Sequence, residues 1–271
     1  MTVRLMRIAT VFAAFVMFGL PILWVISLSL KSPRDFTMDP LGLSFAPTLD
    51  NYRALFANTR FLSFILNSVL VTAGSVALTI ALASPVAYAM ARLKFTGRRA
   101  LSLALLLGLT VPVHITLLPL LKWGSAVNLS GTLFGLGLVY AAFGLAITVF
   151  VMRAGFAEIP IELFEAAKLD GCGEWRTFVM VALPLARPSL AVAAVYNTVM
   201  NYNEFALALT LLMSGKARTL PLGMMDLANE HGPNVPATAA AVTLAVVPVF
   251  VLFIVAQRHI ISGMTAGAIK G

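Results

Sequence analysis

The sequence has 271 residues, of which 60% are hydrophobic and only 11% are charged, with a formal net charge of +8. An average soluble domain is about 45–50% apolar and about 25% charged. A soluble domain of this size cannot bury so much apolar surface, so the composition excludes one. The basic residues lie mostly at the ends of apolar runs. We therefore attribute the positive charge to membrane orientation and expect no nucleic acid partner.

Six apolar runs are long enough to cross a bilayer, which takes about 20 residues. They comprise residues 8–30, 64–90, 101–121, 132–152, 185–212 and 237–256. The pattern predicts an all-α, polytopic membrane protein with six transmembrane helices. Arg4 and Arg7 precede the first run as in a secretory signal, but the run exceeds a signal core of about 7–15 residues. We expect a retained helix.

The distribution of Lys and Arg predicts the orientation. With the N-terminus in the cytoplasm, 12 of the 19 basic residues fall in cytoplasmic segments. The densest group, Arg92, Lys94, Arg98 and Arg99, occupies one short loop, as is typical of a cytoplasmic loop. Both termini are therefore expected inside. The single cysteine, Cys172, excludes an internal disulfide framework.

The segment between the fourth and fifth runs is too polar to enter lipid. Pro160 suits the first turn of a helix, and Glu158 and Glu162 favour the positive end of that helix. Ile161 and Phe164 begin an apolar series at helical spacing, which continues through Ala167 and is followed by Lys168. The pattern predicts a short amphipathic helix.

Gly171 permits a sharp turn and should end this first helix. A second short helix is predicted next, with Trp175, Phe178 and Val179 at helical spacing. Pro184 should stop the second helix and redirect the chain into the fifth run. We expect two short helices, hinged at Gly171, that lie across the cytoplasmic face and fill a groove in a partner.

The same segment carries a family resemblance. It reads Glu165-Ala166-Ala167, three residues, Gly171, nine residues, then Val181-x-Leu183-Pro184. This string resembles the EAA loop of permease subunits of ATP-binding-cassette (ABC) importers, with Val181 in place of the commoner Ile. NYNEFALAL at 201–209 and QRHIISGMTAGAIKG at 257–271 resemble carbohydrate permeases of the maltose permease G type, with Tyr202 replacing the usual Trp. The resemblance covers essentially the whole chain.

The resemblance implies a mechanism in which a partner ATPase drives transport. The EAA helix of the family sits in a cleft of the ATPase subunit and carries closure of the ATPase dimer to the membrane helices. ATPase coupling is thereby expected of Glu165, Ala166, Ala167, Asp170, Gly171, Leu183 and Pro184. Contacts between the C-terminal tail and the ATPase are expected of Thr265, Gly267 and Lys270.

The chain itself is expected to hydrolyse nothing. Its nearest match to a phosphate-binding loop, Gly215-Lys216-Ala217, lacks the Ser or Thr and the required context. We therefore expect no cofactor or metal on this chain, with ATP and Mg used by the partner ATPase. The expected partners are a second permease subunit that is a different chain, an ATPase dimer, a periplasmic or lipid-anchored solute-binding protein and membrane lipid.

The expected location is the bacterial cytoplasmic (inner) membrane. We divide the chain into a first transmembrane helix with an external segment (1–61), a five-helix permease core (62–260) that includes the EAA loop (154–187), and a cytoplasmic tail (261–271). The cargo is a carbohydrate or related solute: a sugar, oligosaccharide, polyol or glycerol-phosphate.

Glu204 is the one acidic residue within an apolar run, and a charge at mid-helix costs about 2.5–3.5 kcal/mol on insertion scales. It should face protein or water. Asn197 and Asn201 lie one turn apart, with Glu204 three residues further along the same side. Two interpretations stay open for these residues: a substrate pathway or a helix-packing network. Both involve Asn197, Asn201, Tyr202, Asn203 and Glu204.

Two other function classes fit less well. An ion-coupled secondary transporter uses several intramembrane acids and detectable repeats, whereas only Glu204 qualifies here. A membrane enzyme needs His, Asp or Glu clustered at one depth, and the sequence contains no such cluster.

Overall fold

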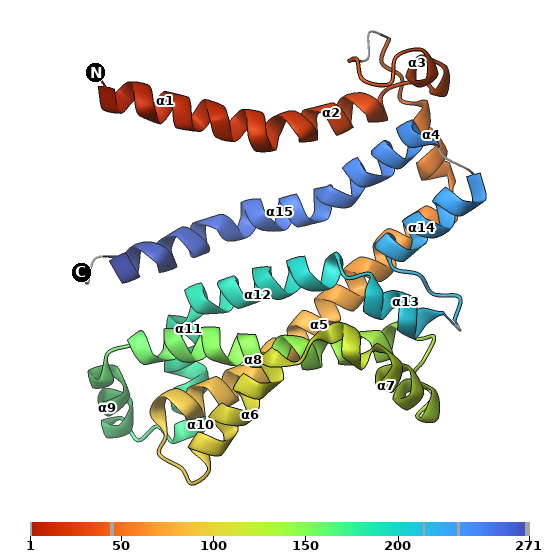
Figure 1. Ribbon diagram of the computed structural model, residues 1–271. Coiled ribbons are helices and arrows are strands. Elements are labelled where there is room, and N and C mark those ends of the chain that lie inside the picture. The colour runs from red at the N-terminus through yellow and green to blue at the C-terminus, as the bar shows by residue number, and fades with distance from the viewer. Residues whose placement is uncertain (1, 44–45, 214, 232–233, 269–271) are drawn as a thin grey trace. The chain divides into compact units, whose positions relative to one another are not determined.

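A computed structural model describes residues 2–43, 46–213, 215–231 and 234–268 (Figure 1). Every regular element among these residues is a helix, which confirms the all-α prediction. The chain forms two compact units, each assembled from two separate segments. Unit 1 comprises Met1–Ile65 and Leu220–Pro248, and unit 2 comprises Leu66–Thr219 and Val249–Gly271.

Four helical stretches are long and apolar enough to cross a membrane: Arg4–Ser29, α5 (Thr59–Arg92), α8 (Leu133–Glu158) and Val235–Ile254, which is part of α15 (Val235–Ala268). The first runs through α1 (Thr2–Ala14), the π-helical turn η1 (Phe15–Gly19) and α2 (Leu20–Ser29). Pro21 lacks an N–H, and its ring would clash with a carbonyl of the preceding turn. The wider π turn accommodates it.

The third predicted run is not one continuous helix. It is divided between α6 (Arg98–Thr110) and α7 (Val113–Ala126), whose axes differ by 99°. Val111 is extended because a residue that precedes proline avoids the helical region, and Pro112 then caps α7. The apolar run over 101–121 is therefore interrupted at this dipeptide, and its role as a single membrane span stays a prediction.

The fifth predicted run is also divided. α12 (Arg187–Tyr202) ends before Asn203, and α13 (Ala206–Leu212) follows after a short turn. α12 is bent by 75° from the helical stretch Glu174–Leu185 that precedes it. Six spans result only if each bent pair crosses the membrane once, so the number of spans stays a prediction. The chain is nonetheless a multi-pass α-helical membrane protein.

Unit 1 also contains three shorter helices: α3 (Pro33–Met38), α4 (Asp50–Ala57) and α14 (Leu220–His231). The buried side chain of Asn51 ties α4 to the end of α2, since its Nδ2 donates to the carbonyl oxygens of Ser29 and Lys31 at 2.9 and 2.8 Å. Tyr52 adds a 2.6 Å hydroxyl–hydroxyl hydrogen bond to Ser29.

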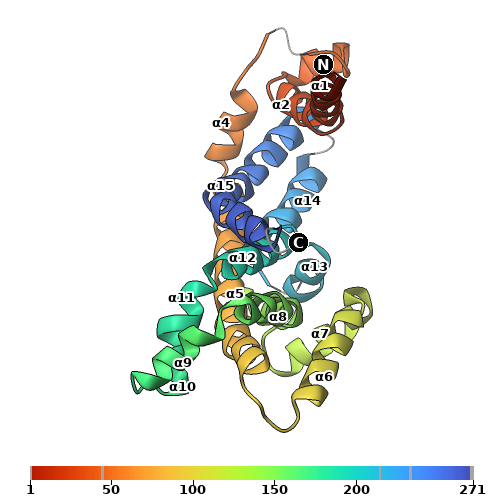
Figure 2. The ribbon, with the colours of Figure 1, turned by 90° about the vertical axis from the view of Figure 1, so that its left-hand side faces the viewer.

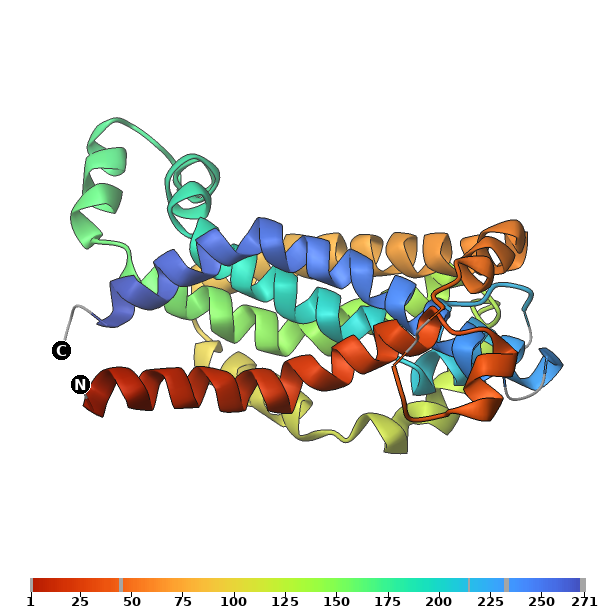
Figure 3. The same cartoon turned by 90° about the horizontal axis from the view of Figure 1, so that it is seen from above.

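Unit 2 has a core at one end of α5 and α8. Small residues such as Ala83 and Ala87 let the helices approach closely, and larger buried side chains fill the remaining space. The larger ones are Tyr88, Met90, Val149, Met152, Phe156, Ile159, Phe164 and Phe178. Figures 2 and 3 show α6 and α7 on one side of α8 and the connection from α8 to α12 on the other.

Candidate functional site

The connection between α8 and α12 forms the two short helices that the sequence predicts. The first is α9 (Ile161–Leu169). The second begins as α10 (Glu174–Thr177), widens into the π-helical turn η2 (Phe178–Ala182) and ends as α11 (Leu183–Leu185). Figures 1 and 3 show α9 projecting beyond the end of α8. Glu158 is the last residue of α8 rather than part of α9, whereas Glu162 lies in the first turn of α9.

Gly171 ends α9, as predicted. Its φ is +76°, in the left-handed region that favours glycine. The N–H of Gly171 donates to the carbonyl oxygen of Lys168 at 3.0 Å, and the N–H of Cys172 donates to that of Ala167 at 2.9 Å. This pair of hydrogen bonds is the Schellman motif, which satisfies the last carbonyls of a helix.

Pro184 does not stop the second helix, contrary to the prediction. It lies inside α11, and the chain bends at Ala186, whose φ and ψ are −84° and 10°. The π turn that precedes Pro184 supplies room for its ring, as at Pro21. The redirection therefore comes two residues later than expected.

The inner face of α9 packs on the chain itself. Phe164 is 5% exposed and Ala167 is 6% exposed. The Phe164 ring lies 6.3 Å from the ring of Tyr88, and the Arg92 guanidinium lies 4.4 Å from its centroid. The apolar series that the sequence assigns to a partner groove is therefore turned inward at these two residues.

Arg92, the last residue of α5, links three elements. Its Nε donates to the carbonyl oxygen of Phe156 at 2.9 Å, and its Nη2 donates to the carbonyl oxygens of Phe156 and Ile159. These carbonyls lie at the C-terminal end of α8, where a positive charge is favoured. With its cation–π contact to Phe164, Arg92 joins α5, α8 and α9.

Glu174 joins the two short helices to α5. Its Oε2 accepts a hydrogen bond from the Tyr88 hydroxyl at 3.1 Å, and its Oε1 lies 3.3 Å from Lys168 Nζ. The Lys168 pair is largely exposed, so it contributes at most about 1 kcal/mol. Phe178 packs beside Tyr88, with ring centroids 5.2 Å apart.

The outer face of α9 is exposed and partly apolar. Leu169 is 89% exposed, and Trp175 on α10 is 69% exposed. Glu165, Ala166 and Asp170 are also exposed. Large apolar side chains on the surface of a polar segment are typical of an interaction site.

The predicted coupling residues differ in burial. The exposed ones are Glu165, Ala166, Asp170, Gly171 and Pro184, whereas Leu183 is half-buried and Ala167 is buried.

Sequence reasoning missed the anchoring role of Arg92, Tyr88 and Glu174. The sequence assigns Arg92 only a role in membrane orientation, and its position at the end of an apolar run is the one available signal.

Two of the three residues predicted to contact the ATPase from the tail lie at the end of α15. Thr265 and Gly267 are in its helical backbone. Lys270 lies outside the described residues.

The polar residues of α12 make contacts between helices. The buried Asn197 donates to Thr148 Oγ1 on α8 at 2.7 Å, and Asn201 donates to Ser75 Oγ on α5 at 2.9 Å. A Cβ atom on Gly144 would overlap Asn197 Oδ1, so glycine is needed there for close approach. Tyr202 is buried and Asn203 is exposed.

Glu204 does not continue the face of Asn197 and Asn201, because α12 ends at Tyr202. Its carboxylate instead accepts the N–H groups of Leu207 at 2.9 Å and Ala208 at 3.1 Å, at the start of α13. The Tyr140 hydroxyl of α8 also donates to Glu204, at 3.2 Å. Glu204 therefore caps a helix.

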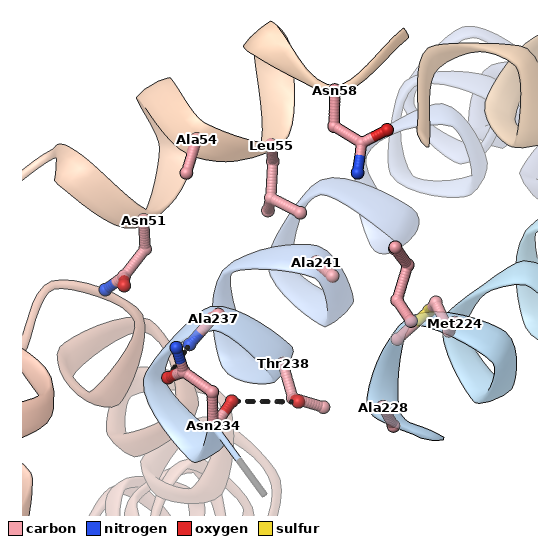
Figure 4. A pocket seen from close by; sticks show the side chains of 11 residues that line it. Asn51, Ala54, Leu55, Asn58, Met224, Ala228, Asn234, Ala237, Thr238 and Ala241 are labelled. Atoms are coloured by element: carbon pink, nitrogen blue, oxygen red, sulfur yellow. Dashed lines mark hydrogen bonds between the residues drawn. The ribbon is translucent and has the colours of Figure 1, made fainter. Parts of the chain in front are cut away.

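A pocket of about 180 Å³ lies within unit 1, between α4, α14 and α15 (Figure 4). Two of its three asparagine side chains already cap helices. Asn58 Oδ1 accepts the N–H of Arg60 at 3.0 Å, and Asn234 Oδ1 accepts that of Ala237 at 3.2 Å. None of the predicted site residues lines this pocket.

The structure thus defines a multi-pass α-helical membrane protein whose connection between α8 and α12 has an anchored inner face and an exposed outer face. The chain matches the model of the family "binding-protein-dependent transport system inner membrane component" over residues 79–266. It belongs to this family. The predicted resemblance to ABC importer permeases is confirmed.

Individual relatives are similar over nearly the whole chain. The trehalose transport system permease protein of Mycobacterium tuberculosis is 35% identical over 254 residues, covering 93% of this chain and 92% of that protein. The diacetylchitobiose uptake system permease protein of Streptomyces coelicolor is 34% identical over 252 residues, covering 92% and 83%. The crystal structure of a bacterial ABC transporter involved in alginate import has the same fold, with a TM-score of 0.82 at 20% identity, covering 95% of this chain and 96% of that one.

Proposed function

We propose that this chain is the permease subunit of an ABC importer that moves a carbohydrate inward across the bacterial inner membrane, with α9 as the helix that couples it to an ATPase. The trehalose and diacetylchitobiose permeases among its relatives support a sugar or oligosaccharide cargo. The observation that carries the coupling role is the two-sided packing of α9. Its inner face is held by α5 and α8, and its outer face is free to enter a partner's cleft.

The anchored inner face of α9 would allow its movement to be transmitted to the membrane helices. Movement of α9 by closure of an ATPase dimer would reach α5 and α8 through Phe164 and the guanidinium of Arg92. On the outer face, Glu165 pairs with a basic residue of the ATPase, and Ala166 allows close approach. Asp170 and Gly171 hold the turn that follows.

The remaining coupling residues act further from the cleft. Ala167 acts from within the chain, by keeping α9 close to its own core. Leu183 and Pro184 shape the return toward α12. The tail residues Thr265, Gly267 and Lys270 are proposed as additional ATPase contacts.

The full transporter requires other subunits. We propose a second, different permease chain, an ATPase dimer that binds ATP and Mg, and a periplasmic or lipid-anchored solute-binding protein. Both termini of this chain face the cytoplasm in this arrangement.

The geometry supports a packing role for the polar residues of α12 over direct contact with solute. The amide groups of Asn197 and Asn201 donate hydrogen bonds to side chains on neighbouring helices, and Glu204 caps α13. Among the five predicted pathway residues, Asn203 is the exposed one, and its amide donates to the Val199 carbonyl oxygen at 2.8 Å.

The coupling role is tested by Glu165→Arg in the tagged protein. This change reverses the charge on the exposed face, so co-purification of the ATPase and solute uptake should both fall sharply, while the permease still accumulates in the membrane. Glu158→Arg, at the exposed end of α8, is the matched control and should retain both. Unchanged uptake with Glu165→Arg would refute the coupling role.

The ion-coupled alternative is separated by reconstitution of the whole complex in proteoliposomes. Uptake should require ATP on the ATPase side and should survive an ionophore that collapses ion gradients. Uptake without ATP would favour a secondary transporter. Competition by unlabelled sugars, oligosaccharides and polyols then identifies the cargo class.

A further inference from the structure

Three arginines meet at a shallow pocket of about 270 Å³ between α6 and α8 in unit 2. Arg98 and Arg99 are the first two residues of α6, and Ser102 lies one turn further along. Arg153 comes from α8. These four residues line the pocket, so its polar groups are three guanidiniums and one hydroxyl, all hydrogen-bond donors.

These arginines have no acidic partner within the described part of the chain. Within the described residues, no hydrogen bond or ion pair occupies the guanidiniums of Arg98, Arg99 or Arg153. Convergent like charges repel one another unless an anion lies between them. Arginine forks match phosphate oxygens in geometry as well as in charge, so a phosphate group is the ligand that this donor set favours.

The pocket lies at the end of the membrane helices that carries α9. Arg92 closes α5 at that end by donating to the Phe156 carbonyl oxygen of α8, and Arg153 precedes Phe156 by about one turn. Lys94 is exposed in the loop that leads to α6. Positive residues at the end of an apolar span lie at the depth of lipid headgroups.

An apolar surface continues from the pocket along α6. Leu101 and Leu105 pack inward against the core of unit 2. Leu103, Leu106 and Leu107 are exposed. A ligand with a phosphate in the pocket and hydrocarbon chains along these three leucines would contact both the arginines and the apolar surface. A soluble phosphate would contact the arginines alone.

We propose that this pocket binds the headgroup phosphate of an anionic phospholipid. Arg98, Arg99 and Arg153 bind the phosphate oxygens, and the Ser102 hydroxyl donates a further hydrogen bond. Basic pockets between helices on the cytoplasmic side are known to favour such lipids. Because Arg153 lies on the helix whose end is bound by Arg92, the lipid would brace the region beside the coupling segment.

The experiment uses the full-length chain, purified in neutral detergent with its associated subunits and titrated with phosphatidylglycerol or with phosphatidylcholine of the same acyl chains. Native mass spectrometry counts the bound lipids. The wild type should retain phosphatidylglycerol preferentially. Affinity should fall about fivefold for each arginine removed, and most in Arg98→Gln/Arg99→Gln/Arg153→Gln.

Two further variants keep the proposal falsifiable. Arg4→Gln/Arg7→Gln/Arg187→Gln removes the same charge at residues that do not line the pocket and should bind phosphatidylglycerol as the wild type does. Arg98→Lys/Arg99→Lys/Arg153→Lys keeps the charge without the forked donors, and it should fold normally with intermediate affinity. Size-exclusion profiles identify any variant that has lost its fold.

Several outcomes overturn the proposal. One is equal binding of the two lipids by the wild type, and another is equal loss in the pocket variant and its charge-matched control. Displacement of the lipid by millimolar inorganic phosphate would assign the pocket to a soluble anion. Loss of a co-purifying subunit without any change in lipid binding would assign it to a protein partner.

Discussion

At the scale of single residues, Glu204 shows how a carboxylate is tolerated in an apolar stretch. Its position at the break between α12 and α13 lets it accept two backbone N–H groups that no helical carbonyl can satisfy. The Tyr140 hydroxyl supplies a third donor. The Glu204 carboxylate therefore supplies the acceptors that the first N–H groups of α13 lack, and its charge is not left without hydrogen-bond donors.

Glu204→Ala should lower the free energy of unfolding by about 1–2 kcal/mol, because α13 loses its cap. Glu204→Gln keeps an acceptor oxygen and should lose less. Thermal unfolding of the detergent-purified chain measures both. Asn203→Ala, in the same turn but exposed, is the control, and a loss there as large as in Glu204→Ala would contradict the capping role.

Arg92 is the second informative residue, because one side chain binds two carbonyls of α8 and the ring of Phe164. Arg92→Lys keeps the positive charge but cannot reproduce the forked donation to both carbonyls. Stability should fall by about 1–3 kcal/mol. If α9 couples to an ATPase, solute uptake should fall further than the amount of folded protein does.

The measurement pairs uptake with thermal unfolding of the same preparation. Arg187→Lys, an exposed arginine at the start of α12, is the control and should change neither. Wild-type uptake and stability in Arg92→Lys would show that the link between α5, α8 and α9 is dispensable.

At the scale of elements, the segment from α9 to α11 shows what a sequence pattern leaves undecided. Helical spacing places Phe164 and Ala167 on one face, and that part of the prediction is correct. Spacing does not say whether the chain or a partner covers this face. Tyr88 and Arg92, more than seventy positions earlier than Phe164, decide it in favour of the chain.

The turn after α9 gives a sharp test of this element. Gly171 and Gly173 both have open space where a Cβ would stand, but only Gly171 has a positive φ. Gly171→Val should therefore strain the turn, cost about 1–3 kcal/mol locally and reduce uptake. Gly173→Val should be tolerated.

Uptake assays and limited proteolysis of the α9–α10 connection read out the two variants. Similar behaviour of both would mean that the left-handed turn does not position α9. Faster cleavage in Gly171→Val but not in Gly173→Val would support the conclusion that the left-handed turn positions α9.

At the scale of the whole molecule, the orientation in the membrane remains the main prediction from the sequence. Cys172 is the only cysteine in the chain and is partly exposed beside Gly171. A membrane-impermeant maleimide should therefore label the native protein in inverted vesicles and leave it unlabelled in right-side-out vesicles. Cys172→Ser is the control for background labelling. The opposite pattern would reverse the topology and remove the cytoplasmic coupling role.

The sequence by itself determined the membrane class, the helical fold and the family, because these depend on composition, on apolar length and on short motifs such as Glu165-Ala166-Ala167. It also located the Gly171 turn, since backbone sterics at that position are local. It misplaced the break at Pro184, because the π turn before Pro184 makes room for its ring and lets the helix continue to Leu185.

Only the tertiary structure decided which residues of the coupling segment face outward. It also brought the Tyr140 hydroxyl to Glu204, gave Arg92 its three partners and brought Arg153 to Arg98 and Arg99. The physical reason is the same in each case. These contacts join residues far apart in the chain, and their energies depend on how the helices approach one another, which no local pattern encodes.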